Sequence, residues 1–424
     1  MMERTSLVFV LSLLSAQAGY ATEWHVLGAR AMGMGGAGVA VSEGPIGAYW
    51  NPASLGRQES PSGVQIPADV HAELTGQFLE GANDVHDIAN ACQTTGPNVG
   101  LCTQPNIDSA LTKLNDPSNG LRADAAAGAH VKIKRLAVFV NNLGYMAGVP
   151  QVDLANATPA NLQAGLNTSK VVLRGLDVTE IGAGYGRELP WLPGLYVGAD
   201  AKLLVGKAGY YNIFLNQNAP SSLSKFMNDA KTSVQPGLDL GALWDVRRTL
   251  DFVPFRPRVG ITARNINNPQ FANPAQATAA GVAGHYSLHG NARLGASLSP
   301  LSWWHLAMDA DLTRNLTTVS GVASQYVGVG TEINLGNSQR FNFPLRAGLA
   351  RNMAEKGAKT SITGGFGVHL LHAMLDVSAM VSPASVQIKS ARETQKIPSN
   401  LSVAVQFGAL FGGGKDAGKG GKED

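Results

Sequence analysis

Apolar and polar residues alternate along most of this chain. After about residue 125, short runs with a period of two recur about thirteen times, and residues 63–75 are a candidate first strand. In residues 195–203 (LYVGADAKL), for example, every second residue is Leu, Val or Ala. A period of two places successive side chains on opposite faces of a β-strand. The pattern therefore predicts an all-β protein built from consecutive hairpins.

The connections between these runs alternate in length. Short joints fall near residues 134, 190, 250, 300, 338 and 371, whereas longer or more polar connections cover 76–126, 148–170, 212–232, 268–284, 315–322, 354–357 and 385–397. Outer-membrane barrels alternate short periplasmic turns with longer external loops in this way. We therefore predict a transmembrane antiparallel β-barrel of about 14 strands over residues 63–411, with both chain ends in the periplasm.

The connection 76–126 differs from the others. Residues 78–93 and 107–114 have helix-like spacing, and Gly-Pro and Asp-Pro pairs interrupt the region. We expect a long loop with short helices here. It contains both cysteines, Cys92 and Cys102, which could form a disulfide in an oxidising compartment. A metal pair and a redox dithiol are the alternatives, although the spacing does not fit C-x-x-C and no nearby histidine completes a zinc set.

A soluble β-sandwich or a solenoid is the alternative fold, because a sandwich also alternates apolar and polar residues. About 300 residues of hairpins is long for one sandwich, and no repeat of fixed period is present. Composition also favours the barrel. Only 15% of residues are charged and 44% are hydrophobic, whereas about a quarter of a soluble domain is charged. The net charge of +3, without a basic run interleaved with aromatics, gives no support for a nucleic-acid partner.

The chain begins with a predicted signal peptide. An arginine precedes an apolar stretch over residues 7–14, and Ala16-Gln17-Ala18 supplies a cleavage pattern. We predict a signal peptide over residues 1–18, with cleavage up to Ala21 as the second choice. A membrane anchor is the alternative, but the stretch is too short to cross about 30 Å of hydrocarbon. Residues 412–424 are rich in Gly and Lys and predict a flexible tail.

A glycine-rich segment follows the signal. Gly33, Gly35 and Gly38 match G-x-G-x-x-G, a pattern that binds dinucleotides only between a strand and a helix of a βαβ unit. No such unit follows here. Small residues also permit close backbone packing in a confined space such as a barrel lumen, and we favour this interpretation.

No catalytic or metal-binding motif is present, so we expect neither an enzyme nor a bound metal or other cofactor. His285 and His289 are four residues apart, which on a strand separates them by about 13 Å. Asp309 and Asp311 share one strand face with His305 and could perform acid–base chemistry. We favour instead that they pair with cations in the lumen. The candidate cations are Arg258, Arg264, Arg293 and Arg346.

Residues 28–41 (GARAMGMGGAGVAV) and 48–53 (AYWNPA) carry a family resemblance. The segment resembles the N-terminus of the FadL superfamily of outer-membrane proteins, most closely its conjugal-transfer TraF-like group, and it is also similar to PorV-type secretion barrels. The chain lacks the terminal aromatic residue of many barrels, and no C-x-x-C supports the redox role of an unrelated periplasmic factor called TraF.

The resemblance implies that residues 19–62 form a hatch in the barrel lumen. The hatch residues it implies are Gly33, Gly35, Gly36, Gly38, Trp50, Asn51, Pro52 and Ala53. It implies a passive uptake channel for small hydrophobic compounds in a Gram-negative-type outer membrane, with the lipid bilayer and a hydrophobic small molecule as partners. The alternative is a structural or assembly component that works with envelope proteins of conjugation or secretion.

Overall fold

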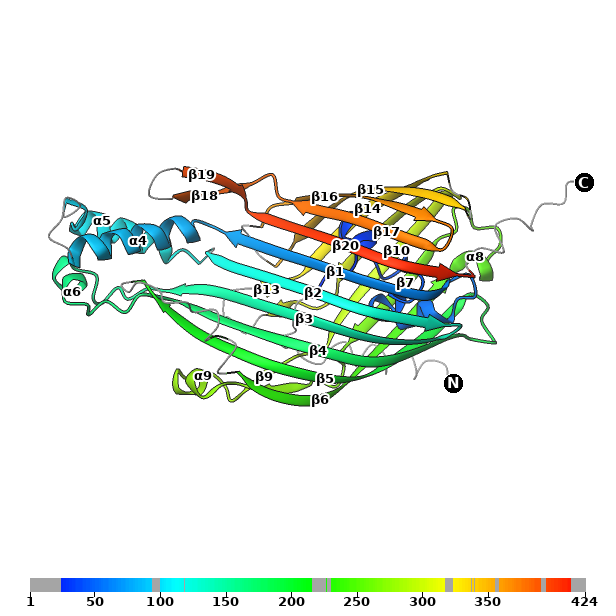
Figure 1. Ribbon diagram of the computed structural model, residues 1–424, viewed down its shortest axis with the longest axis horizontal. Coiled ribbons are helices and arrows are strands. Elements are labelled where there is room, and N and C mark those ends of the chain that lie inside the picture. Colours follow the sequence, from blue (N-terminus) through cyan, green and yellow to red (C-terminus); the bar gives the residue numbers. More distant parts are fainter. Residues whose placement is uncertain are drawn as a thin grey trace, which may run out of the picture.

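The computed structural model describes residues 24–412 except 94–99, 118, 216–225, 227–229, 317–322, 337, 339, 355–357 and 390–393. The predicted signal peptide and residues 413–424 of the predicted tail lie outside the described residues. The described chain forms a closed antiparallel barrel of fourteen strands, in which each strand pairs with its neighbours along the chain and β20 pairs with β1 (Figure 1). The predicted fold class is thus confirmed.

The barrel strands are β1 (Ser62–Thr75), β2 (Gly120–Ile133), β3 (Leu136–Gln151), β4 (Lys170–Glu188), β5 (Leu195–Phe214), β6 (Lys231–Asp245), β7 (Arg258–Arg264), β10 (Asn291–Leu301), β11 (Trp304–Asp311), β14 (Tyr326–Leu335), β15 (Phe341–Asn352), β16 (Ser361–Leu370), β17 (Ala373–Val381) and β20 (Asn400–Phe411). Three two-stranded sheets lie in the loops: β8 (Gln270–Ala272) with β9 (His285–Ser287), β12 (Asn315–Leu316) with β13 (Ala323–Ser324), and β18 (Ser385–Lys389) with β19 (Thr394–Pro398).

The helices are short. They are α2 (Ala29–Gly33), α3 (Gly47–Trp50), the 3-10 helix η1 (Pro52–Gly56), α4 (Phe78–Gln93), α5 (Gln104–Leu114), α6 (Pro159–Gln163), α8 (Val246–Thr249) and α9 (Ala275–Ala279). Within the described ranges, no helix is both long and apolar enough to cross a membrane.

Strand β3 illustrates how the alternating sequence determines the two faces of the wall. Leu136, Val138 and Val140 are about half exposed, at 50%, 48% and 46%, whereas Ala137 and Asn141 are fully buried. The other barrel strands also carry apolar residues on the outer face, while their inner faces combine small and polar residues with buried apolar ones such as Leu204 and Leu243. A continuous exposed apolar surface of this extent is unfavourable in water and suits a lipid environment.

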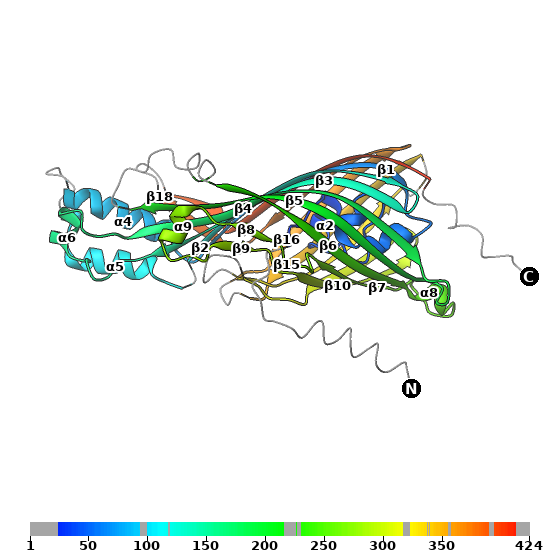
Figure 2. The ribbon, with the colours of Figure 1, turned by 90° about the horizontal axis from the view of Figure 1, so that it is seen from below.

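The two ends of the barrel differ. Short turns and α8 lie at one end, whereas the opposite end carries α4, α5, α6 and the β18–β19 hairpin (Figures 1 and 2). Strands β4 and β5, of 19 and 20 residues, continue toward this loop end. The first long loop is shorter than the predicted range 76–126, because β2 already begins at Gly120. Alternation is weak in residues 121–127, where Ala occupies both faces.

The loop end contains a small core of its own. Helices α4 and α5 pack together through residues such as Val85, Ile88 and Leu111, all buried. The Sγ atoms of Cys92 and Cys102 are 2.03 Å apart and form a disulfide across this pair of helices. The covalent link and the buried side chains together hold α4 and α5 against the extended strands.

Reduction of the disulfide should loosen these helices and leave the barrel intact. Cross-links of short loops contribute about 2–4 kcal/mol, so the Cys92→Ser, Cys102→Ser double variant should show faster amide exchange in α4 and α5. Hydrogen-exchange mass spectrometry measures this, with β14 and β15 as internal references. Unchanged exchange in both helices would contradict the prediction.

Candidate functional site

Residues 24–61, here called the luminal segment, fold inside the barrel at its turn half (Figures 1 and 2). Nearly all of its side chains are buried between residues 24 and 57. Gly28, Gly35, Gly36 and Gly44 have positive φ angles, which allow the sharp turns of this path. A Cβ at Gly38 would approach the Trp50 ring to 2.2 Å, so this position requires glycine. Gly33 ends the five-residue helix α2, and no described strand precedes it as a dinucleotide site would require.

The residues of the Trp50-Asn51-Pro52-Ala53 element fasten this segment to itself and to the wall. Trp50 Nε1 donates to the Leu27 carbonyl at 3.0 Å. Asn51 Nδ2 donates to the carbonyl of Ala242 on β6 at 3.0 Å, while Asn51 Oδ1 accepts from the Ala53 amide at 3.1 Å. The side chain of one asparagine therefore caps η1 and contacts the barrel at the same time.

Glycines on the lumen face of the wall let the luminal segment approach the strands closely. A Cβ built on Gly328 would lie 1.9 Å from the Gly35 carbonyl oxygen, and one on Gly330 would lie 2.4 Å from Met34. On the other side, Gly198 and Gly241 face Pro52 and Asn51 in the same way. The two backbones are thus in direct contact on both sides of the lumen.

Asp309 on β11 binds the luminal segment by its backbone. Its Oδ2 accepts hydrogen bonds from the amides of Gly38 at 2.8 Å and Val39 at 2.9 Å. Both bonds are buried, and bonds of this kind from amides to a carboxylate are stronger than neutral ones. Asp309 therefore anchors the glycine-rich turn.

Asp309→Ala should release this turn, because two buried amides would lose their acceptor at a cost of about 1–3 kcal/mol each. We expect added trypsin to cut the variant at Arg30 or Arg57 in detergent, while the parent protein resists. Asp251→Ala, at an exposed turn position, is the control and should resist equally well. Resistance of Asp309→Ala would refute the anchoring role.

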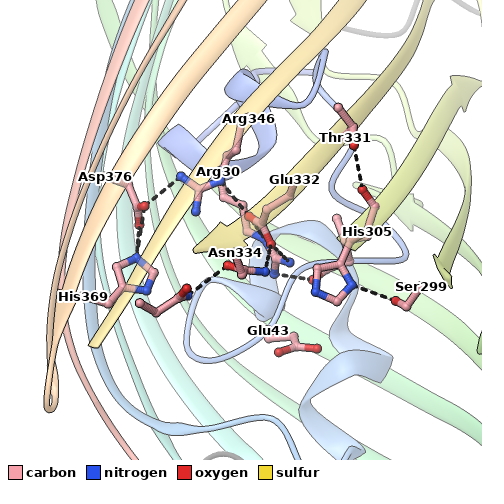
Figure 3. Close-up of polar contacts among 12 residues, drawn as sticks. Arg30, Glu43, Ser299, His305, Thr331, Glu332, Asn334, Arg346, His369 and Asp376 are labelled. Atoms are coloured by element: carbon pink, nitrogen blue, oxygen red, sulfur yellow. Dashed lines mark hydrogen bonds and ion pairs between the residues drawn. The ribbon is translucent and has the colours of Figure 1, made fainter. Parts of the chain in front are cut away.

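A chain of five ionisable side chains connects α2 with the wall (Figure 3). Arg30 donates from Nε and Nη2 to Glu332 at 2.9 and 2.7 Å, and Arg346 Nε donates to the same carboxylate at 2.7 Å. Arg346 Nη1 then donates to Asp376 at 2.7 Å, and Asp376 lies 3.1 Å from His369 Nε2. Glu332, Arg346 and Asp376 are almost completely buried. Arg30 of the luminal segment is thereby linked through Glu332 to side chains of four adjacent strands, β14, β15, β16 and β17.

A second cluster occupies the opposite wall. Glu180 accepts from Lys202 Nζ at 2.9 Å and from Arg264 Nη2 at 2.8 Å, and Asp239 lies 2.8 Å from Lys202. The Arg264 guanidinium also lies 4.1 Å from the centre of the Tyr49 ring. A cation above an aromatic face is favourable, so this cluster too holds the luminal segment.

The predicted pairing with a lumen arginine is found for Asp311 and is wrong for Asp309. Arg293 Nε donates to Asp311 Oδ1 at 2.6 Å, but Asp309 binds amides. The remaining arginines have other acidic partners: Arg258 contacts Glu43 and Asp245, Arg264 contacts Glu180 and Asp239, and Arg346 contacts Glu332 and Asp376. Strand register and the path of the luminal segment determine these pairs, and neither can be read from spacing along one strand.

Glu43 in the luminal segment is surrounded by arginines. Arg57 Nη1 lies 2.9 Å and Arg258 Nη1 3.2 Å from its Oε1. Burial alone would raise the pKa of the Glu43 carboxyl, but Arg57, Arg258 and Arg30 outweigh burial and hold this pKa well below its ordinary value. Because the pKa is lower in the folded state, the carboxylate stabilises the fold at neutral pH. That contribution disappears as the pH falls below the ordinary glutamate range toward the folded pKa.

Two cavities lie on either side of the luminal segment. The turn-side chamber has a volume of about 290 Å³ and a mixed lining, in which charged and polar residues such as Arg30, Glu43, His305 and His369 alternate with apolar ones such as Leu27, Ile46 and Met374. The loop-side pocket is narrower, at about 40 Å³. Its lining includes Trp24, Val26, Met32, Asp69, His71, Arg122, Asp124, Tyr326, Ala350, Met380 and Ser402. A neighbouring cavity of about 40 Å³ shares His25 and continues the apolar surface through Leu143, Leu176 and Leu288.

The structure separates the other residues singled out for chemistry. His305 Nδ1 lies 2.8 Å from Ser299 Oγ in the turn-side chamber (Figure 3), away from the anchoring carboxylate of Asp309. His285 lies exposed in the β8–β9 hairpin. The described ranges contain no group of three or more His, Cys, Asp or Glu side chains that could hold a metal ion.

Sequence reasoning missed Arg30, Glu332 and Trp24, and only the lumen-facing position of Glu332 within its alternating run offered a signal.

Several solved structures of β-barrel proteins are similar to this chain in fold. The "TodX monoaromatic hydrocarbon channel deltaS2 mutant" superposes with a TM-score of 0.51 at 11% identity, over 92% of this chain and 100% of that chain. The "CymD monoaromatic hydrocarbon channel" gives a TM-score of 0.49 at 13% identity, over 92% and 99% of the two chains. A FadL homologue of Pseudomonas aeruginosa gives 0.49 at 11% identity, over 93% and 100%. At 11% sequence identity, the similarity to the TodX structure shows that the two proteins share a fold.

Among curated protein sequences, none matches this chain. A family model described as "F plasmid transfer operon, TraF, protein" matches residues 48–311, which is more than half of the 424 residues. The match begins in the luminal segment and extends through β11. The chain therefore belongs to this TraF protein family of the F plasmid transfer operon, and the TraF-like resemblance is confirmed.

Proposed function

We propose that this protein is an outer-membrane channel for passive uptake of small hydrophobic compounds. Residues 19–62 act as its hatch, residues 63–411 as its barrel, and the loop-side pocket as the binding site above the hatch. The observation that carries the proposal is an apolar pocket enclosed between Trp24, Val26 and Met32 of the luminal segment and Ala350 and Met380 of the wall. Such pockets inside a barrel bind small ligands.

Two further features support this assignment. The apolar outer belt suits a lipid bilayer as the partner of the barrel. The superposing TodX structure is itself described as a monoaromatic hydrocarbon channel, which supplies a ligand class to test. We infer no enzymatic activity.

Uptake of labelled toluene by proteoliposomes tests the proposal. The Ala350→Leu variant fills the loop-side pocket and should reduce uptake several-fold, whereas Ala347→Leu, on the exposed outer face of the same strand, should leave it unchanged. Deletion of residues 28–56 should alter uptake as well. Heat-modifiable gel mobility verifies that each variant is folded. Equal uptake by all variants and by empty vesicles would refute the channel function.

A structural role in a conjugation or secretion apparatus is the second candidate. The family description, with its reference to a plasmid transfer operon, favours it. The disulfide-linked α4–α5 module at the loop end offers a surface outside the barrel for contacts with envelope proteins. A strain lacking the gene should then lose plasmid transfer, and the full-length protein should restore it. Unimpaired transfer without the protein would exclude this role.

A further inference from the structure

The loop-side pocket has one polar wall. His71 on β1 pairs directly with Asp124 on β2 and with Ser402 on β20. Residues opposite each other on adjacent strands place their side chains on the same face, about 5 Å apart. All three side chains line the pocket, so a serine, a histidine and an aspartate form a row across three strands.

Each member of this row keeps one polar atom without a hydrogen-bond partner among the described residues. The Nδ1–H of His71 donates to Asp124 Oδ2 at 2.6 Å, which leaves His71 Nε2 and Asp124 Oδ1 unpaired. Ser402 Oγ is unpaired as well, and so is Oδ2 of Asp69, two residues before His71 on the same strand face. An unsatisfied buried polar atom is unfavourable. These four atoms lie on the neighbouring strands β20, β1 and β2 at one pocket and point to a ligand that bonds with them.

Another part of the pocket is apolar. Met32 and Val26 of the luminal segment and Ala350 and Met380 of the wall line it, and the charged residues Arg122, Arg293 and Asp309 border it as well. A ligand that fits both parts therefore has an apolar body and one polar group. The open volume of the pocket is about 40 Å³. This limits the ligand to a small molecule and requires the side chains of the pocket to move when it binds.

The charged side chains around the pocket determine which kind of polar group a ligand can carry there. Arg122 is paired with Glu73 and Asp124, and Arg293 is paired with Asp311. An anionic ligand would face the carboxylate of Asp124, and a cationic ligand would lie near two guanidinium groups. A hydroxyl group is neutral and both donates and accepts. It can donate to His71 Nε2 or Asp124 Oδ1 while it accepts from Ser402 Oγ.

We propose that the preferred ligand is a small aromatic or aliphatic alcohol or phenol rather than a hydrocarbon, and that Ser402, His71 and Asp124 recognise its hydroxyl group. This inference rests on the proposed uptake function and names the substrate class of that pocket. Sites built to hydrogen-bond a ligand reject the analogue that lacks the bonding group, because their own polar atoms are then left unpaired.

Isothermal titration of the detergent-solubilised protein with 4-methylphenol and toluene tests this, since the two differ by a single hydroxyl group. Empty micelles provide the blank for partition into detergent. We expect 4-methylphenol to bind at least about tenfold more tightly, which corresponds to about 1.4 kcal/mol. In Ser402→Ala and His71→Leu the ratio should fall toward one, with toluene binding retained. Ser297→Ala, which alters only the turn-side chamber, should keep the ratio of the parent protein.

The outcomes separate the two proposals. If toluene binds as tightly as 4-methylphenol, the hydroxyl preference is wrong and the uptake function stands. If the parent protein prefers 4-methylphenol and both Ser402→Ala and His71→Leu keep that preference, then Ser402 and His71 do not recognise the hydroxyl group. If neither compound binds, both the uptake function and the hydroxyl preference fall.

Discussion

Glu332→Gln is expected to release the luminal segment from the wall. Glu332 accepts from both Arg30 and Arg346, so the neutral amide leaves the buried Arg346 and the partly buried Arg30 without their shared negative charge. Loss of one partner from a buried ion pair costs about 3–5 kcal/mol. Local opening of residues 24–61 should therefore become roughly 100-fold more frequent. Hydrogen-exchange mass spectrometry of peptides from this segment measures the change.

The matched control is Glu59→Gln. Glu59 accepts from Arg248 at 3.0 Å, but both side chains are about one third exposed. Exposed pairs contribute about 0–1 kcal/mol, so exchange in the luminal segment should remain that of the parent protein. Equal exchange in Glu332→Gln and Glu59→Gln would show that the buried charge network does not hold the segment.

Gly328→Ala is expected to displace the luminal segment by steric conflict. The added Cβ would lie 1.9 Å from the carbonyl oxygen of Gly35. Both atoms belong to or are attached directly to the backbone, so the conflict cannot be relieved by rotation of a side chain. Overpacking of a close contact costs about 1–3 kcal/mol or more. We expect a larger ion leak through the barrel in planar bilayers, because the segment no longer seats against β14.

Gly364→Ala on β16 provides the comparison for this substitution. A Cβ at Gly364 would meet only the Arg346 carbonyl oxygen at 3.8 Å, an ordinary contact. Both variants therefore carry the intrinsic effect of replacing a glycine in a strand, but only Gly328→Ala creates a steric conflict with the luminal segment. Identical conductance of the two variants would argue against a tightly seated segment.

The barrel could be predicted from the sequence because its wall obeys a local rule. Alternation with a period of two identifies each strand, and the contrast of short and long connections orders them, so fourteen strands were expected and are present. Alternation fails where both faces carry small residues, as at Ala123–Ala127, and there the start of β2 was predicted too late.

The interior could not be predicted in the same way. Glu332 meets Arg30 across 302 positions of the chain, a contact that depends on barrel closure and on the path of the luminal segment. Asp309 was expected to bind an arginine and instead binds two amides, because the glycine turn that supplies them is positioned only by the whole fold. The row of Ser402, His71 and Asp124 likewise requires β20, β1 and β2 to lie side by side, which follows from closure.

We expect each barrel strand to present one face to lipid and the other to a lumen filled by the luminal segment. Nitroxide labels at Val138, Phe366 and Phe407 on the outer face, and at Ser378 on the inner face, test it in bilayers by their accessibility to oxygen and to a water-soluble nickel complex. We predict high oxygen and low nickel accessibility at the three outer positions, and an immobilised label at Ser378. Outer labels as accessible to nickel as those on exposed loops would contradict the account.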